Sequence, residues 1–359
     1  MIRTCPSEPT GPRRWPMTCL LLLLAAGCNV SSLRRDLPPE ESLGFRAAAM
    51  DALKKAAFSD VPNTRIQALE AFQEIGTREG VECLGINITN RFGDVTVENY
   101  TGVTFAGLMA LGTLRNAEFI EQIRNRAEDP DPHVKIAALF ALHRLGDQRR
   151  TGEMGDYLLH HSDARVRANA AIAIGRLGEP KSVKLLRRAL QQEDKIAPKI
   201  QILEALAIYG DEHGIERLIA FAYDPRPDLV ALALMCLADA ECPAAEKLFR
   251  LRLTSSDYPE TKLAAALGLG KLGSDAGLDL AIAYLYFKTP DKSRPDDPPE
   301  QQISRARGLA ALALEAIGSP LAIGPLRDAF EADGQSEYVR LAAARAAIRI
   351  IDRRRGRLP

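Results

Sequence analysis

The sequence has few of the residues on which aromatic recognition and charge-driven binding depend. Phe, Tyr and Trp make up 6% of the 359 residues, and Trp15 is the only tryptophan. Lys and Arg number 47, and Asp and Glu also number 47, so the net charge is zero. Stacking of sugars, bases or large aromatic cofactors and non-specific attraction to nucleic acid are therefore not expected. We predict no nucleic-acid partner, no cofactor and no small-molecule substrate.

Cysteines are too few and too irregularly spaced for a disulfide framework or a zinc site. Beyond residue 28 the chain has Cys83, Cys236 and Cys242, an odd number without a Cys-x-x-Cys spacing. Cys236 lies in the apolar segment LVALALMCLADA and is expected to be buried as a small apolar residue.

The first 27 residues have the pattern of a signal peptide. Three arginines in residues 1–14 precede the apolar segment CLLLLLAA at residues 19–26, which is too short to span a bilayer. The segment leads into Ala26-Gly27-Cys28, preceded by Leu24. This resembles the lipobox of bacterial lipoproteins, with Ala25 where that family usually has Leu.

The resemblance implies that Cys28 is lipidated, becomes the mature N-terminus and anchors the protein in the membrane. Asn29 is not Asp, which by the same resemblance implies sorting to the outer membrane, facing the periplasm. Residues 28–40 (CNVSSLRRDLPPE) are expected to form a polar tether outside the fold. An ordinary cleavage site beside an unmodified thiol stays open as the alternative.

From residue 41 to the end, the range 41–359, one pattern repeats at intervals of mostly 30 to 36 residues. The segment HVKIAALFALHRLG is followed one interval later by RVRANAAIAIGRLG. A small residue and a bulky residue four positions apart share one helix face, and a glycine follows as the helix ends. We place this terminal position at Gly76, Gly112, Gly146, Gly178, Gly210, Ala240, Gly273, Gly318 and Ile351. The period predicts an all-α solenoid of about nine helix pairs.

Two charged series accompany the repeat. The acidic series comprises Asp60, Asp131, Asp163, Asp194, Asp224 and Asp257. The basic series comprises Arg65, Lys135, Arg167, Lys199, Lys262, Arg307 and Arg340. Together with the AAxA(L/I)GxLG pattern, these series resemble the HEAT-like repeats of the bilin-lyase type. The resemblance implies that the acidic residue caps the second helix and that the basic residue reaches an acidic residue of a neighbouring unit. We therefore assign these charges to structure.

Motifs of catalytic chemistry are absent or explained by the repeat. Residues 268–273 spell Gly-x-Gly-x-x-Gly, but no strand precedes them. The chain has no His-Glu dipeptide, which argues against the di-iron hydroxylases built on HEAT-like repeats. Asp156 and His160 share a helix face but are expected to be a solvated pair, so no metal site is predicted.

An apolar strip on the inner face is the candidate partner-binding site. Six residues before the terminal position, five units carry a large apolar side chain: Phe140, Ile172, Leu234, Leu267 and Leu312. Equivalent positions of successive units come into register in a solenoid. Either these side chains form a groove for a partner segment, or they are buried between neighbouring helices.

Two further segments depart from the repeat. Residues 288–302 (KTPDKSRPDDPPEQQ) are predicted to be an inserted loop. The C-terminus from Arg340 carries seven arginines, which we interpret as a polar cap on the last unit.

These observations favour a non-catalytic protein–protein interaction scaffold, exported and lipid-anchored in the cell envelope, with a protein partner of unknown identity. The alternative is an enzyme or enzyme-like lyase that uses the apolar concave face as a substrate cradle. Unpaired titratable groups gathered on that face would favour the alternative, and the sequence by itself indicates none.

Overall fold

A computed structural model describes residues 30–89, 97–291 and 296–356, with the side chains of residues 97–100 left aside. It contains eighteen α-helices, and no strand occurs among these residues. The first helices of the pairs are α2 (Pro39–Ala56), α4 (Arg78–Thr89), α6 (Ile120–Arg126), α8 (Thr151–His160), α10 (Ser182–Gln192), α12 (Glu212–Phe221), α14 (Glu246–Ser255), α16 (Leu278–Leu285) and α18 (Ile323–Glu331). The second helices are α3 (Pro62–Ile75), α5 (Val97–Thr113), α7 (Pro132–Arg144), α9 (Ala164–Gly175), α11 (Ile196–Ile208), α13 (Pro227–Asp239), α15 (Pro259–Lys271), α17 (Pro299–Ile317) and α19 (Glu337–Arg354). The predicted nine helix pairs are thus confirmed.

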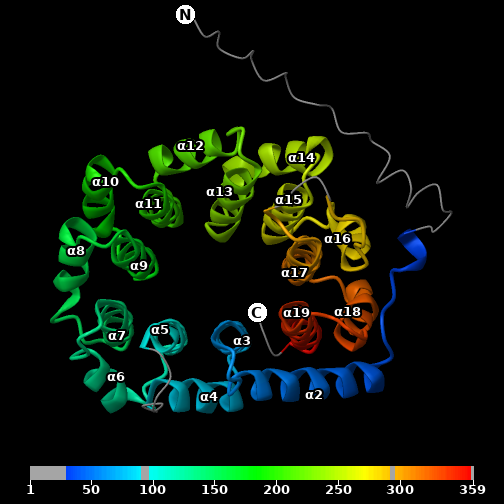
Figure 1. Ribbon diagram of the computed structural model, residues 1–359, viewed down its shortest axis with the longest axis horizontal. Coiled ribbons are helices and arrows are strands. Elements are labelled where there is room, and N and C mark those ends of the chain that lie inside the picture. The colour runs from blue at the N-terminus through cyan, green and yellow to red at the C-terminus, as the bar shows by residue number, and fades with distance from the viewer. Residues whose placement is uncertain (1–29, 90–96, 292–295, 357–359) are drawn as a thin grey trace, which may run out of the picture.

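The helix pairs form a closed ring of two layers (Figure 1). The first helices and the short 3₁₀ helices η1 (Val30–Ser32), η2 (Pro243–Ala245) and η3 (Pro320–Ala322) lie on the outside, and the second helices line the inside. Consecutive inner helices pack against one another, and α19 also packs against α2 and α3. The last repeat therefore meets the first, which the sequence analysis did not predict.

The helix ends correct the repeat register in three units. A left-handed residue follows the inner helix at Gly76, Gly146, Gly178, Gly210, Gly273 and Gly318, as predicted. In two of the other units this conformation falls on Arg115 (φ 51°) and Glu241 (φ 47°), not on Gly112 and Ala240. In the last unit α19 continues past Ile351, and the left-handed residue is Gly356. We predicted Gly112 because glycine adopts the left-handed conformation most easily, but the structure places Arg115 in that conformation.

The glycines of residues 268–273 have packing and backbone roles. A Cβ on Gly268 would lie 2.5 Å from the Phe249 ring, and one on Gly270 would lie 2.7 Å from the backbone nitrogen of Ile317. Gly273 has φ +81°. This segment is therefore part of the helix α15 and its end, with the sequence demanded by close helix packing.

The acidic series caps the inner helices in only some units. Asp131 and Asp163 accept hydrogen bonds from the backbone N–H two residues later, at the N-termini of α7 and α9. Asp224 makes the same contact with the N–H of Arg226, just before α13. Near Asp60, Asp194 and Asp257 the acceptor is instead the preceding residue: Ser59, Glu193 and Ser256. In these three units, as at Asp224, the donor is the N–H of the residue just before the helix and no side chain caps the helix N-terminus, so the predicted caps are wrong at all four positions.

The basic series links neighbouring repeats most clearly at Arg167. Its guanidinium forms hydrogen bonds of 2.7 and 2.9 Å to both carboxylate oxygens of Glu193, which belongs to the next repeat. Arg307 instead binds the backbone oxygen of Phe287 and the side chain of Gln335. Both arrangements connect an inner helix to the end of an outer one, as expected for charges with a structural role.

Ring closure is held by buried and half-buried polar contacts. Arg46 of α2 makes two 2.7 Å hydrogen bonds to the carboxylate of Asp352, whose side chain is 4% exposed. Arg349 of α19 pairs with Glu74 of α3. The rings of Phe45 and Phe330 lie 5.4 Å apart at the same junction. Of the C-terminal arginines, Arg349 and Arg354 contact Glu74 and Asp36 near the other end of the chain, and Arg345 and Arg353 contact Glu315, so the predicted solvent-facing polar cap is wrong for these four.

Residues 33–38 form an N-terminal strap across the last two repeats, where a free tether was predicted. The N–H of Arg35 donates to the Leu321 carbonyl (2.9 Å), and the Arg35 carbonyl accepts from the N–H of Gly324 (2.8 Å). Arg34 pairs with Asp279 at 2.6 Å, and Leu37 is 4% exposed. The free tether predicted for residues 28–40 is therefore wrong for residues 33–40, which belong to the strap and to α2. Residues 1–29, with the predicted signal peptide and Cys28, lie outside the described residues.

The predicted insert is shorter than residues 288–302. Helix α17 already begins at Pro299, and Gln302 is buried. Its side chain accepts from the N–H of Asp291 (2.8 Å) and donates to the Asp291 carbonyl (2.9 Å). Residues 292–295 lie outside the described part. The connection is therefore closed by Gln302 at its base.

We expect Asp352→Ala to lower the free energy of unfolding by about 3 kcal/mol, because Arg46 is left without its buried partner. Small-angle scattering should also show a larger radius of gyration as the ends separate. Asp51→Ala removes an exposed ion pair with Lys55 on the same helix α2 and serves as the control, with no measurable change expected. Equal stability of the two variants would contradict the importance of the junction.

Candidate functional site: the charged centre of the ring

The corrected register defines two positions, two and six residues before the left-handed residue, that face the ring centre on several of the inner helices. They lie one helical turn apart on the same face. Several of them carry charge, in contrast to the apolar strip that the sequence predicted. We define the central charged site by its five residues: Glu70, Arg176, Glu204, Asp239 and Lys271.

The central charged site is reached by water, and four of its members lack direct partners. Glu70, Arg176, Asp239 and Lys271 are exposed, whereas Glu204 is half-buried. Within the described part of the chain, those four exposed residues make no hydrogen bond or ion pair with protein, and their charges are therefore available to water or to a ligand.

Electrostatic interactions show that these side chains share one interior. Burial raises the pKa of Glu70 on α3, of Glu204 on α11 and of Asp239 on α13. Arg176, at the end of α9, lowers each of these pKa values by a smaller amount. These helices lie around the inner wall, with α3 across the ring from α11 (Figure 1). A single cation thus acts on carboxylates from several sides of the ring.

Glu204 has the most perturbed carboxyl group of the site. Burial and the neighbouring Asp239 carboxylate raise its pKa to about 7, although Arg176 acts in the opposite direction. The buried thiol of Cys236 donates to Glu204 Oε2 over 3.8 Å. Burial raises the pKa of that thiol well above its usual value, so Cys236 is a neutral donor, as expected for a small buried residue. Glu204 can therefore gain or lose a proton near neutral pH.

The α19 side of the interior carries a paired network. Glu315 accepts from Arg349 at 2.8 Å and pairs with Arg345 at 2.8 Å, and Arg349 also pairs with Glu74. Although burial acts in the opposite direction, Arg345 and Arg349 lower the pKa of Glu74. These charges neutralise one another and belong to ring closure, so they leave the central charged site as the part without internal partners.

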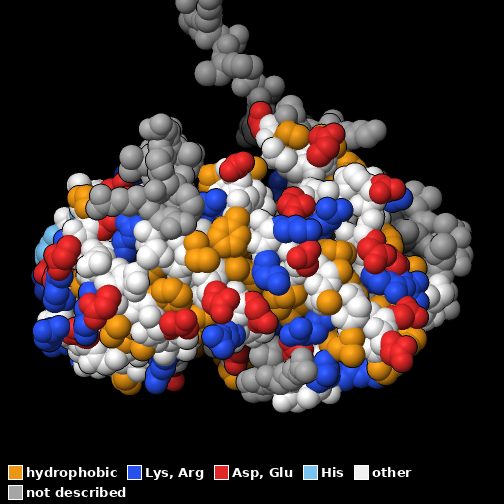
Figure 2. Space-filling view, turned by 90° about the horizontal axis from the view of Figure 1, so that it is seen from below, with side chains coloured by type: hydrophobic (Ala, Val, Ile, Leu, Met, Phe, Trp, Pro, Cys, Tyr) orange, Lys and Arg blue, Asp and Glu red, His pale blue; other side chains and the backbone are white. Residues whose placement is uncertain are grey.

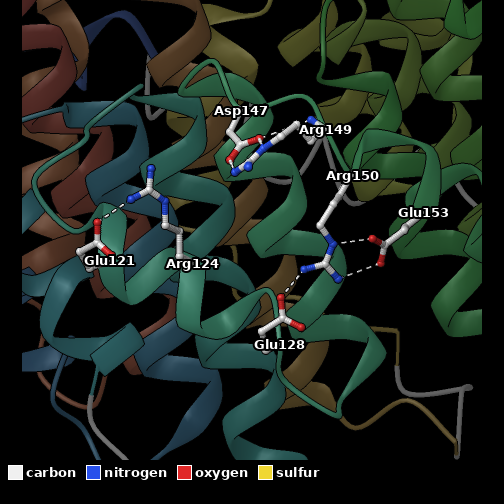
Figure 3. Close-up of polar contacts among 7 residues, drawn as sticks. All are labelled: Glu121, Arg124, Glu128, Asp147, Arg149, Arg150 and Glu153. Carbon is white, nitrogen blue, oxygen red and sulfur yellow. Dashed lines mark hydrogen bonds and ion pairs between the residues drawn. The ribbon is translucent and has the colours of Figure 1, made fainter.

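Charges on the outside of the ring are, by contrast, paired with close neighbours (Figure 3). Arg150 binds Glu153 of its own repeat and Glu128 of the preceding one. The hydrogen bonds from Arg149 lower the pKa of Asp147 to about 2. Figure 2 shows acidic and basic side chains interspersed over the outer face of the ring that lies at the bottom of Figure 1. Outer charges thus have the ordinary role of solvated pairs between repeats.

The predicted apolar strip is not an exposed surface at three of its five positions. Phe140 and Leu234 are 0% exposed and Leu267 is 7% exposed. Of the two interpretations, burial between neighbouring helices is the correct one for these residues. Ile172 and Leu312 are half-buried, and their contact with a partner stays a prediction. At Leu234 the cause is the register error, because Met235 occupies the inward position.

The histidines do not assemble a metal site. His160 and His161 line a shallow surface depression on α8 together with Glu153, Asp156 and Tyr157. No group of three or more His, Cys, Asp or Glu side chains in the described ranges has an arrangement that could hold a metal ion. The depression lies on the outer layer, away from the central charged site.

The sequence contained a signal for the central charged site that the analysis did not use. Glu70, Glu204 and Arg345 carry charge at the position, six residues before the repeat end, where five other units carry a large apolar side chain. Asp239 lies one residue before Ala240, where most units carry a bulky side chain. The shift of that repeat to Glu241 moves Asp239 to an inward position. What the sequence could not show was that the ring closes around these side chains.

Residues 153–238 match the family model of HEAT repeats. This segment is therefore similar to HEAT repeats, and the other helix pairs of the ring have the same two-helix arrangement. No curated protein matches the sequence. None of the described helices has the length and hydrophobicity needed to cross a membrane.

Solved structures with similar folds include a lyase complex and a hydroxylase. One is the complex of CpcE and CpcF of phycocyanin lyase from Nostoc, at 16% identity and TM-score 0.41, covering 77% of this chain and 94% of that one. Another is human deoxyhypusine hydroxylase, at 19% identity and TM-score 0.35, covering 79% and 99%. An engineered protein matches at 17% identity and TM-score 0.28, covering 84% and 98%. At these values the similarity concerns repeat architecture alone.

We expect the stability of the wild-type protein to fall relative to Glu204→Gln as pH rises from 4.5 to 8. The raised pKa of Glu204 favours the protonated native state, so its contribution is present at low pH and is lost as pH passes about 7. The difference should be on the order of 2 kcal/mol, measured by chemical denaturation at both pH values.

Glu153→Gln is the control with the opposite sign. Hydrogen bonds from Arg150 lower the pKa of Glu153, so its contribution is present above the unfolded pKa and is lost on acidification. The same pH trend for both variants would show that Glu204 is an ordinary solvated carboxylate.

Proposed function

We propose that the protein is a non-catalytic binding protein, exported and lipid-anchored in the bacterial cell envelope, whose binding site is the centre of its ring. The central charged site supports this proposal because it offers exposed charges that the protein itself leaves without direct partners. A closed ring also fixes these charges before a ligand arrives, which reduces the ordering cost of binding. The other charged groups described above serve the helix caps, the links between repeats and ring closure.

An enzyme-like role is the second candidate, favoured by one observation. A carboxyl group with a pKa of about 7 can transfer a proton at neutral pH, and perturbed groups of this kind gather at catalytic sites. The described site contains no established nucleophile, because the Cys236 thiol is buried and its pKa is raised. The two roles differ in Glu204→Gln, which should abolish turnover in an enzyme, whereas in a binding protein it should only weaken the binding of the partner.

The membrane anchor is tested at Cys28. Cys28→Ser should move the protein from the membrane fraction to the soluble fraction with unchanged circular dichroism, because the described fold begins after this residue. A high-salt wash of the wild-type membranes is the control for electrostatic attachment. A variant that still sediments with washed membranes would contradict lipidation as the anchor.

The binding site is tested by photo-crosslinking from one inner and one outer position. Leu232 is 39% exposed and shares a face of α13 with Met235 and Asp239, whereas Leu251 is 45% exposed on the outer helix α14. A photoreactive residue at position 232 should give a specific adduct in native membranes that is lost with Asp239→Asn. Adducts from position 251 alone would place binding on the outside and would contradict the proposal.

A further inference from the structure

The central charged site contains an ordered arc of charge along four successive inner helices. Arg176 follows α9, Glu204 lies on α11, Asp239 on α13 and Lys271 on α15, so the order of charge is positive, negative, negative, positive. The Asp239 carboxylate raises the pKa of Glu204, while burial raises the pKa of Asp239 and Lys271 opposes that rise. We name these four residues the charge arc.

The helix spacing explains why the arc does not neutralise itself. Packed helices lie about 8 to 10 Å apart, which is beyond ion-pair distance for side chains that project in parallel toward the ring centre. In the described structure no ion pair joins any two members of the arc. A ligand that carries the complementary order of charge would therefore replace water at several positions.

The same spacing matches an extended peptide. A β-like chain advances about 3.3 Å per residue, so three residues span roughly one step between inner helices. Ile208 and Leu232 are 38% and 39% exposed on α11 and α13, and they offer apolar contacts to aliphatic side-chain stems beside the carboxylates.

We propose, resting on the proposed binding function, that the charge arc binds an extended peptide segment in which a lysine is flanked on both sides by acidic residues about four positions away, because the lysine lies about one and a half helix steps from Arg176 and from Lys271. The lysine ammonium lies between Glu204 and Asp239, and the flanking carboxylates meet Arg176 and Lys271. Glu70 faces this segment from α3 and adds to the preference for a cation at its middle. A purely anionic ligand would meet the two central carboxylates, and a purely cationic one would meet the two terminal cations.

The test uses three fluorescent undecapeptides with blocked termini and measures binding by anisotropy at pH 7.5. GDSGSKSGSDG carries the proposed order, GKSGSDSGSKG carries the inverted order, and GNSGSQSGSNG is neutral. The first peptide should bind the full-length protein with a Kd below about 1 mM and at least tenfold more tightly than the other two, with the affinity decreasing at high salt. Equal binding of the inverted peptide, or no binding of the first at 1 mM, would overturn the proposal.

Matched variants on one helix locate the interaction. Asp239→Asn, on the inner face of α13, should weaken the first peptide at least fivefold, whereas Asp228→Asn, exposed at the start of the same helix, should leave it unchanged. Equal effects of both variants would also overturn the proposal. Crosslinking from position 232 distinguishes failure of this proposal from failure of the proposed function. A specific adduct without peptide selectivity would support binding at the ring centre and reject this class of ligand. Absence of both the adduct and the peptide selectivity would reject both proposals.

Discussion

The contact between the last and the first repeat is the constraint on which the rest of the structure depends. An open solenoid exposes its concave face to bulk water, where charged side chains are fully solvated. Here Arg46 and Asp352, together with Arg349 and Glu74, join α19 to α2 and α3. The concave face thereby becomes an interior that water enters but protein surrounds. The raised pKa of Glu204, Asp239 and Glu70 is the electrostatic consequence of this closure.

Closure also assigns a role to segments that look peripheral in the sequence. The N-terminal strap joins the last two repeats through backbone hydrogen bonds between Arg35 and residues 321 and 324. Its ion pairs to Asp279 and Asp328 lie on the outer layer. Because the strap precedes α2 and contacts α16 and α18, it crosses the junction from outside while the arginines of α19 cross it from inside. The anchor proposed at Cys28 would therefore be connected to the ring at its junction.

The fold could be predicted from the sequence because each repeat carries the same local demands: a small residue, a bulky residue one turn later, and a helix end. The site could not, because its members lie in different repeats and become neighbours only when the ring closes. The error at Ala240 illustrates the limit. We expected Ala240 at the helix end, but the left-handed residue is Glu241. This shift of one position replaces the buried Leu234 by Met235 at the inward position and makes Asp239 a member of the central charged site.

The small residues of the inner helices give a physical reason for a ring of this curvature. Nine repeats that complete a circle turn by roughly 40° each, which requires inner helices to approach more closely than outer ones. A Cβ on Gly112 would lie 2.8 Å from Ala141 Cα, and one on Gly175 would lie 2.7 Å from Ala205 Cβ. With the corrected register, Gly112, Gly175 and Gly270 all occupy the position three residues before the helix end, and each faces the next inner helix. Small residues at that position thus set the angle between repeats, the angle brings α19 to α2, and closure creates the charged centre.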